Sequence, residues 1–239
     1  MKKTFFSLLL LAGLVTLSFA QKTINDPNAE KRTVGSFHGI EVATGIELTL
    51  TKGGTEEVAV SASEKEFRDK IVTEVVNGVL KIHYEPKSGA INRKNENKKL
   101  KAYVSYKSLD LLYATTGAEV DIDGVLEAAT LEMKANTGGQ IKGEINIGKL
   151  NVDQNTGSKI TFSGKVDKLE AQGDTGSKFQ GENLTTNTCV VEMSTGAGIY
   201  ISVEKELNVK ANTGGYIKYK GNAGIREIKT NTGGTVSRI

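Results

Sequence analysis

Two tyrosines and two lysines near the carboxyl end have the spacing of a ligand-binding surface. Tyr200, Tyr216, Lys218 and Lys220 each follow an alternating pattern with apolar residues, so all four would point outward from β-strands. Tyrosine rings can lie against sugar rings, and lysine ammonium groups donate hydrogen bonds beside them. The sequence therefore predicts a ligand-binding site at these four residues. Tyrosines partly covered by their neighbours on a sheet face are the alternative interpretation.

Paired carboxylates, which cleavage of a polysaccharide would need, do not occur at matching positions. Glu132 and Glu170 occupy equivalent positions in the repeat described below, but the copy between them carries Asn151. The other outward positions mix acidic, basic and uncharged residues. We predict no catalytic residues and a protein that is not an enzyme, with a polysaccharide-active enzyme as a minor alternative.

Residues that could hold a metal or react as nucleophiles are isolated. His38 and His83 have no Cys or His at ligand spacing, and no Gly-Lys-Ser/Thr phosphate loop is present. The single cysteine, Cys189, occupies a position where other repeat copies carry Leu, which predicts a buried apolar role. One cysteine also rules out an internal disulfide. We predict no metal site and no cofactor.

A repeat must position these side chains. A Thr-Gly step recurs seven times at nearly constant spacing, as in "KANTGGQIKG" and "KANTGGYIKY". A regular period of about 20 residues is typical of stacked structural units. The seven glycines, which we interpret as structural turn residues, are Gly117, Gly138, Gly157, Gly176, Gly196, Gly214 and Gly233.

Apolar residues alternate with polar ones on both sides of each step, which predicts two short half-buried strands per repeat. The position three after each glycine is always apolar: Val120, Ile141, Ile160, Phe179, Ile199, Ile217 and Val236. The position five before it is also always apolar: Leu112, Met133, Val152, Ala171, Val191, Val209 and Ile228. We therefore predict an all-β fold, a β-solenoid with about seven rungs of roughly 19 residues.

Each Thr-Gly step is expected to be a sharp corner, because glycine adopts positive φ without a Cβ penalty. The Thr has the parity of the core positions, so we expect it to point inward or along the corner. A ladder of Asn, Asp, Ser and Thr two residues before the glycines should run along the outer edge. A second turn after each downstream strand is marked by Gly124, Gly164 and Gly221.

The preceding segment, 33–108, is rich in strands but irregular, and we expect it to form wider coils that cap one end. Gly53-Gly54 and Asn77-Gly78 each predict a β-hairpin, and a short helical turn is expected between them. The basic run 87–101 is interpreted as a solvated loop, with a contact to a polyanion as the functional alternative.

Residues 1–20 have the basic start, apolar stretch and small-residue end of a signal peptide, which predicts export to the periplasm, outer envelope or cell exterior. Without the leader's two lysines, 29 basic residues face 28 acidic ones, which argues against a nucleic-acid partner. No further apolar run has membrane length. We divide the rest into a linker, 21–32, and one domain, 33–239, with 33–108 preceding the regular solenoid at 109–239.

"FHGIEVATGIELTL", 37–50, and the Asn-Gly-Val-Leu segment, 77–80, resemble the putative auto-transporter adhesin, head GIN domain family. The resemblance covers roughly Arg32 to Ile239 and implies an exported bacterial β-helix-like domain with a role in adhesion. The tripeptide that names the family here is Gly45-Ile46-Glu47, with Glu in place of Asn.

Two functions fit these observations. The first is an exported binding or adhesion module whose partner is a glycan, a matrix protein or an envelope protein. The second is a structural envelope protein that forms homo-oligomers through the end of the solenoid near Val236, where no polar cap is apparent.

Overall fold

A computed structural model describes residues 26–86 and 97–239. The predicted signal peptide, the start of the linker and most of the basic run lie outside the described residues. Sixteen strands of the described part join in one sheet, and one helical turn accompanies them. The elements are β1 (Glu30–Arg32), β2 (Gly39–Val42), β3 (Glu47–Lys52), β4 (Glu57–Ser61), α1 (Lys65–Arg68), β5 (Ile71–Val76), β6 (Val79–Tyr84), β7 (Lys101–Tyr106), β8 (Leu111–Ala114), β9 (Glu119–Ala135), β10 (Gln140–Gln154), β11 (Lys159–Gly173), β12 (Lys178–Met193), β13 (Gly198–Ala211), β14 (Tyr216–Lys220), β15 (Gly224–Thr230) and β16 (Thr235–Arg238).

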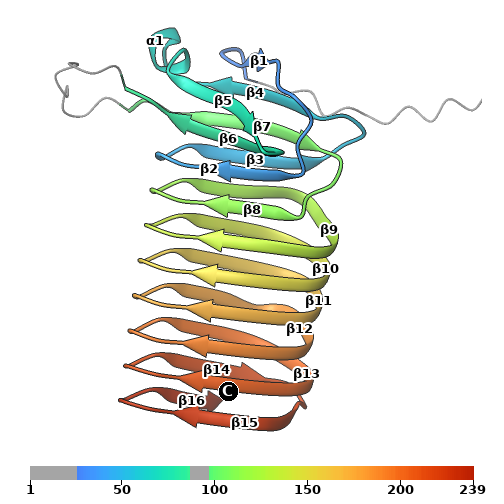
Figure 1. The fold of residues 1–239 in the computed structure, drawn as a ribbon, viewed down its shortest axis with the longest axis vertical. Coiled ribbons are helices and arrows are strands. Elements are labelled where there is room, and N and C mark those ends of the chain that lie inside the picture. Colours follow the sequence, from blue (N-terminus) through green and yellow to red (C-terminus); the bar gives the residue numbers. More distant parts are fainter. Residues whose placement is uncertain (1–25, 87–96) are drawn as a thin grey trace, which may run out of the picture.

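The chain winds into a stack of parallel coils, which confirms the predicted all-β solenoid of about seven rungs (Figure 1). The expectation of two short strands per repeat was wrong for most of the stack. Each of β9 to β13 runs unbroken from one Thr-Gly corner to the next, over 14 to 17 residues. The predicted second turn is a bend within each of these strands and does not interrupt them. Neighbouring rungs stay paired through their backbones on both sides of this bend.

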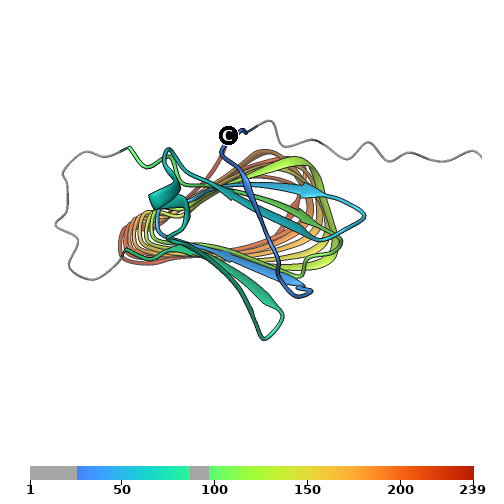
Figure 2. The same ribbon diagram turned by 90° about the horizontal axis from the view of Figure 1, so that it is seen from above.

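Viewed along the stack, each coil has two long sides that meet at a narrow end and diverge toward the bend (Figure 2). The post-corner side consists of the strand segments that follow a Thr-Gly corner, and the pre-corner side of those that precede one. Inward side chains from both sides form one core, and Val120, Met133 and Leu150 are among its fully buried members. Cys189 is also buried there, as expected.

The corners are built from two consecutive left-handed residues. Every Thr before a corner glycine has φ between 42° and 51°, and the seven glycines have φ between 68° and 76°. The threonines are exposed, so of the two predicted orientations, inward or along the corner, the inward one was wrong. Strand parity does not continue through two residues of positive φ. Small residues just after the glycine, such as Ala118, Ser158 and Ala197, occupy the inside of the corner instead.

Differences in repeat length are absorbed at the bend. β10 and β11 stay in register from Gln140↔Lys159 to Gln154↔Gly173. In most unequal pairs the register shifts between the two halves of the strand, for example between Gly181 and Thr185 of β12. Between β13 and β15 it shifts on the pre-corner side, between Leu207 and Asn208. The corner geometry is therefore constant along the stack, and side chains near it align from rung to rung.

The segment before the repeat caps one end of the stack, as expected. Its first coil, β2 and β3, has its own corner at Thr44-Gly45, and Gly45 N–H donates to Thr116 O at 3.0 Å. This coil lies directly on β8 and β9. The intervening chain forms the outer layers, in which β4 and β5 pair antiparallel with β7 and β6.

One hairpin prediction was right and the other wrong. β5 and β6 form the hairpin around Asn77-Gly78, and the short helix α1 precedes it. β3 and β4 do not pair, because β7 lies between them and contacts both. Glu30–Arg32, assigned to the linker from the sequence, form β1 against β4.

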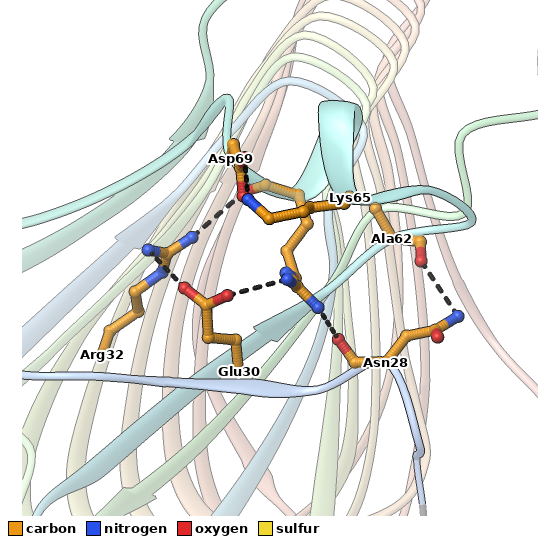
Figure 3. A network of polar contacts seen from close by, with 7 residues as sticks. Asn28, Glu30, Arg32, Ala62, Lys65 and Asp69 are labelled. Atoms are coloured by element: carbon orange, nitrogen blue, oxygen red, sulfur yellow. Dashed lines mark hydrogen bonds and ion pairs between the residues drawn. The ribbon is translucent and has the colours of Figure 1, made fainter.

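An ion-pair network fixes β1 to the cap (Figure 3). The Glu30 carboxylate binds Arg32 at 2.9 Å and Arg68 of α1 at 2.8 Å. Arg68 also donates to the backbone oxygen of Asn28 at 2.8 Å, and the Asn28 amide donates to Ala62 O at 3.3 Å. Side chains thus stabilise this end, where the parallel ladder stops.

Candidate functional site

The predicted binding residues lie on the outer surface of two neighbouring strands, β13 and β14, next to the final strand β16. β13 and β14 pair in parallel on the post-corner side, with Gly198 opposite Tyr216 and Tyr200 opposite Lys218. Both strands alternate strictly: Ile199, Ile201 and Ile217 enter the core, and the residues between them face outward. Alternation therefore brings three of the four predicted residues together, Tyr200, Tyr216 and Lys218.

The two tyrosine rings meet edge to face, with centroids 6.0 Å apart and an interplanar angle of 76°. The Lys218 ammonium lies 5.2 Å from the centre of the Tyr200 ring, within range of a cation–π contact. Both rings are half-buried, so each keeps part of its surface for a ligand. Lys220 is exposed on the same strand, opposite Ser202 and toward the bend.

Gly198 was not predicted from the sequence, and its role is steric. A Cβ at this position would overlap the Tyr216 ring, so the ring lies over the backbone of Gly198. The repeat alignment did contain a sign of this role, because the position two after the corner glycine carries Gly only in this copy. The missing side chain makes room for the aromatic pair.

Lysines on the same outer face were also missed. Lys159 and Lys178 occupy the position two after the corner glycine on β11 and β12 and are paired residues in the ladder. Both are exposed. The repeat alignment already contained them, but their clustering with the tyrosines depends on the parallel stacking of four strands.

The acidic residues considered for catalysis do not form an acid/base pair. Asn151 stands opposite both Glu132 and Glu170 in the ladder, so it separates the two carboxylates. Lys168, at 2.7 Å, holds the pKa of Glu170 below its ordinary value, whereas a general acid needs a raised one. Glu132 binds Lys134 at 2.7 Å. Among residues 26–86 and 97–239, no three His, Cys, Asp or Glu side chains gather as a metal site would require.

The remaining candidate groups are structural. Burial raises the pKa of the Cys189 thiol to about 12, and Thr186 Oγ1 lies 2.9 Å from its sulfur. His38 contacts Asp110 at 2.6 Å on the surface of the cap. The described part of the chain contains no helix of the length and apolarity that crossing a membrane requires.

A shallow hollow lies at the cap, lined in part by Asp26, Ser61, Lys101 and Tyr103. Tyr103 donates to the Asp26 carboxylate at 2.8 Å. Burial, with the neighbouring carboxylate, raises the pKa of Tyr103 to about 12, so its hydroxyl stays protonated. These groups satisfy one another, and the post-corner surface remains the better candidate for a ligand.

Solved structures with the same fold come from Bacteroides and Parabacteroides species. A putative adhesin from Bacteroides fragilis superimposes with a TM-score of 0.78 at 18% identity, covering 88% of this chain and 96% of the other. A putative adhesin from Parabacteroides merdae gives 0.67 at 14% identity, with 88% and 95% covered. A putative lipid binding protein from Parabacteroides distasonis gives 0.64 at 16% identity, with 90% and 98% covered.

No curated protein matches the sequence. The family model described as putative auto-transporter adhesin, head GIN domain, matches residues 36–223, which is most of the chain. The predicted resemblance is thereby confirmed, and the chain belongs to this head GIN domain family.

Proposed function

We propose that this protein is an exported, non-enzymatic adhesion module that binds a glycan across Tyr200, Tyr216, Lys218 and Lys220. The observation that carries the proposal is the aromatic pair on a rigid sheet face, with a lysine against one ring. The adhesin names of the family and of its structural relatives support a surface-binding role. An envelope location agrees with the leader-like start of the sequence.

The geometry suits a sugar because a pyranose ring has apolar C–H faces and a polar rim. The exposed parts of the tyrosine rings can pack against such a face, and the phenol and ammonium groups can donate to the rim hydroxyls. Both tyrosines extend from strands packed on the core, so little side-chain ordering remains to oppose binding.

The test is a screen of purified 21–239 against immobilised glycans, bacterial envelope polymers and matrix proteins. We expect a glycan hit whose binding falls at least about tenfold in the Tyr200→Ala/Tyr216→Ala double variant. Tyr113→Ala is the matched control, because Tyr113 is a half-buried outward tyrosine on β8 of the pre-corner side. A hit that survives the double variant, or no hit from folded protein, would overturn this assignment.

A second candidate function, a structural role through self-association, rests on the last rung. Ile225, Ile228 and Ile239 expose 45 to 60% of their surface there, because the described stack has no rung beyond them, and Val236 is half-buried. Two copies meeting at this end would cover these side chains. Sedimentation velocity should then show a dimer that Ile225→Ser/Ile228→Ser abolishes. Val190→Ser is the control, since Val190 on the pre-corner side is 46% exposed. A monomer at all concentrations would exclude this role.

A further inference from the structure

Charge is unevenly distributed along the outer surface that carries the two tyrosines. The outward side chains two and four residues after the corner glycines form two columns along the stack. Toward the cap, these two columns contain Glu47, Glu119 and Asp121. Lys142 follows and is neutralised by Glu119 at 2.9 Å and Asp121 at 3.4 Å. From Lys159 onward, these two columns contain no acidic residue in the described chain.

The lysines beyond this point are not matched by carboxylates. The outward residues of β11, β12 and β14 include Lys159, Lys178, Lys218 and Lys220, and none of them forms an ion pair with a described residue. Two carboxylates of these strands lie toward the bend: Glu182 of β12, six residues after its corner glycine as Lys220 is, and Glu204 of β13, one outward position further. We call the four lysines together with Tyr200 and Tyr216 the basic aromatic surface.

This arrangement costs stability. Lys159 and Lys178 are paired positions on neighbouring parallel strands, about 5 Å apart along the stack. Like charges facing each other across strands repel. Elsewhere the same fold avoids the problem: on the pre-corner side, Lys134 binds Glu132, and Lys210 binds Glu192 at 2.7 Å. A ligand that brings negative charge to the basic aromatic surface would relieve the repulsion.

We propose that the basic aromatic surface binds an acidic polysaccharide, with its carboxylate or sulfate groups on the lysines and its sugar rings on the tyrosines. This inference rests on the proposed function and names the charge of its ligand. The surface crosses four strands, β11 to β14, so it extends about 14 Å along the stack. A short stretch of a linear polymer fits that length, lying parallel to the solenoid axis.

Two other anionic partners, a lipid membrane and a nucleic acid, fit this surface less well. A membrane contact calls for protruding apolar side chains, but the exposed large apolar residues of the described chain are Val76, Val125, Val190, Ile225, Ile228 and Ile239, none of them in these columns. Nucleic acid presents phosphates at high density, and a strand longer than the surface would extend over Glu119 and Asp121. An acidic polysaccharide has fewer charges, separated by uncharged rings.

The experiment measures binding of 21–239 to polygalacturonate by titration calorimetry, with neutral dextran of similar length as the reference polymer. We expect binding to polygalacturonate alone, weakening as NaCl rises from about 50 to 500 mM. Lys159→Gln/Lys178→Gln should weaken it at least about fivefold, by loss of two exposed ionic contacts. Lys134→Gln/Lys210→Gln, on the pre-corner side, is the matched control and should leave affinity unchanged. Unchanged melting curves would show that both variants fold.

The outcomes separate this inference from the function on which it rests. Tyrosine-dependent binding of a neutral glycan without any binding of polygalacturonate would overturn the acidic ligand and leave the glycan-binding function standing. Binding of polygalacturonate that needs the lysines but not the tyrosines would overturn the aromatic site. Equal affinity for phosphatidylglycerol vesicles or single-stranded DNA at the same salt would overturn the assignment to polysaccharide.

Discussion

The regular rungs and the cap of the described solenoid are held together by different interactions. In the regular rungs, parallel strands extend the backbone ladder, and the N–H of each corner glycine before Gly233 donates to the Thr carbonyl of the next rung, for example Gly138 to Thr156 at 3.0 Å. In the cap the ladder turns antiparallel, and long-range side-chain contacts such as Glu30–Arg68 fix the outer layer. The regular rungs should therefore respond to backbone changes, and the cap to side-chain changes.

The largest effect is expected from Gly164→Ala, at a bend of the regular rungs. Gly164 has φ of 105°, and a Cβ there would overlap the carbonyl oxygen of Ile145 in the neighbouring rung. Neither backbone can move without breaking the ladder, so we expect a loss of roughly 3 kcal/mol in unfolding free energy. Guanidinium denaturation measures it. Labelling of the buried Cys189 thiol, one rung away, should also become faster.

Gly157→Ala is the control for that prediction. Gly157 has φ of 68°, but a Cβ there meets no atom within 4 Å. Only the left-handed conformation is penalised, at about 1 kcal/mol. Equal losses for the two variants would show that backbone contact between rungs does not govern the regular stack.

A moderate effect is expected in the cap from Arg68→Ala. The change removes an ion pair with Glu30 and the hydrogen bond to Asn28 O, and the Arg68 side chain is only 17% exposed. We expect a loss of about 1–2 kcal/mol, confined to β1 and α1. Hydrogen exchange should rise in 26–32 and 62–70, while labelling of Cys189 stays at the wild-type rate.

Lys65→Ala is the matched control, because Lys65 pairs with Asp69 but is 74% exposed. Its effect should be within about 0.5 kcal/mol. Faster labelling of Cys189 in Arg68→Ala would contradict the separation of cap and rungs.

The same comparison explains what could be predicted from the sequence. Within the rungs, the core positions recur once per rung at nearly constant spacing, so alternation alone located Val120, Ile141 and Ile160 in the core. The outward direction of Tyr200 and Tyr216 followed from the same alternation. Their contact, and their proximity to Lys159 and Lys178, depended on which strands are neighbours and on the missing side chain at Gly198.

The cap could be predicted only in part, because its strands are not neighbours in sequence order. Thr44-Gly45 has the corner geometry, but Gly45 precedes Gly117 by several repeat lengths, so the period did not reveal it. A local turn signal predicted the Asn77-Gly78 hairpin. The Gly53-Gly54 signal failed because β7, which comes much later in the chain, pairs with β3 and displaces β4.

A smaller effect is expected from Gly78→Ala in the cap hairpin. Gly78 has φ of 77°, similar to the corner glycines, and its Cβ would meet the imidazole of His38. That ring is a side chain on the surface and can rotate away, unlike a neighbouring carbonyl. We expect a loss of about 1 kcal/mol in thermal or denaturant unfolding. A loss as large as that of Gly164→Ala would mean that His38 is held as firmly as backbone.

The smallest effect concerns the pH dependence of the contact between the cap and the first rungs. His38 precedes β2, accepts a backbone hydrogen bond from Asp110, and contacts its carboxylate at 2.6 Å. The hydrogen bond to Asp110, and then its charge, raise the pKa of His38 above the ordinary value near 6.5. A raised pKa in the folded state means that the contact stabilises fully below about pH 6.5, and that this stabilisation is lost as pH rises through the higher, folded-state pKa.

Removal of the Asp110 charge tests this pH dependence. NMR titration of the His38 ring should show the raised midpoint, and Asp110→Asn should lower it. Without the carboxylate, His38 loses the interaction that raises its pKa, so Asp110→Asn should flatten the decline in melting temperature above pH 6.5. Because the pair is exposed on the cap, the regular rungs should be unaffected. An unchanged His38 midpoint in Asp110→Asn would show that the carboxylate does not control this titration.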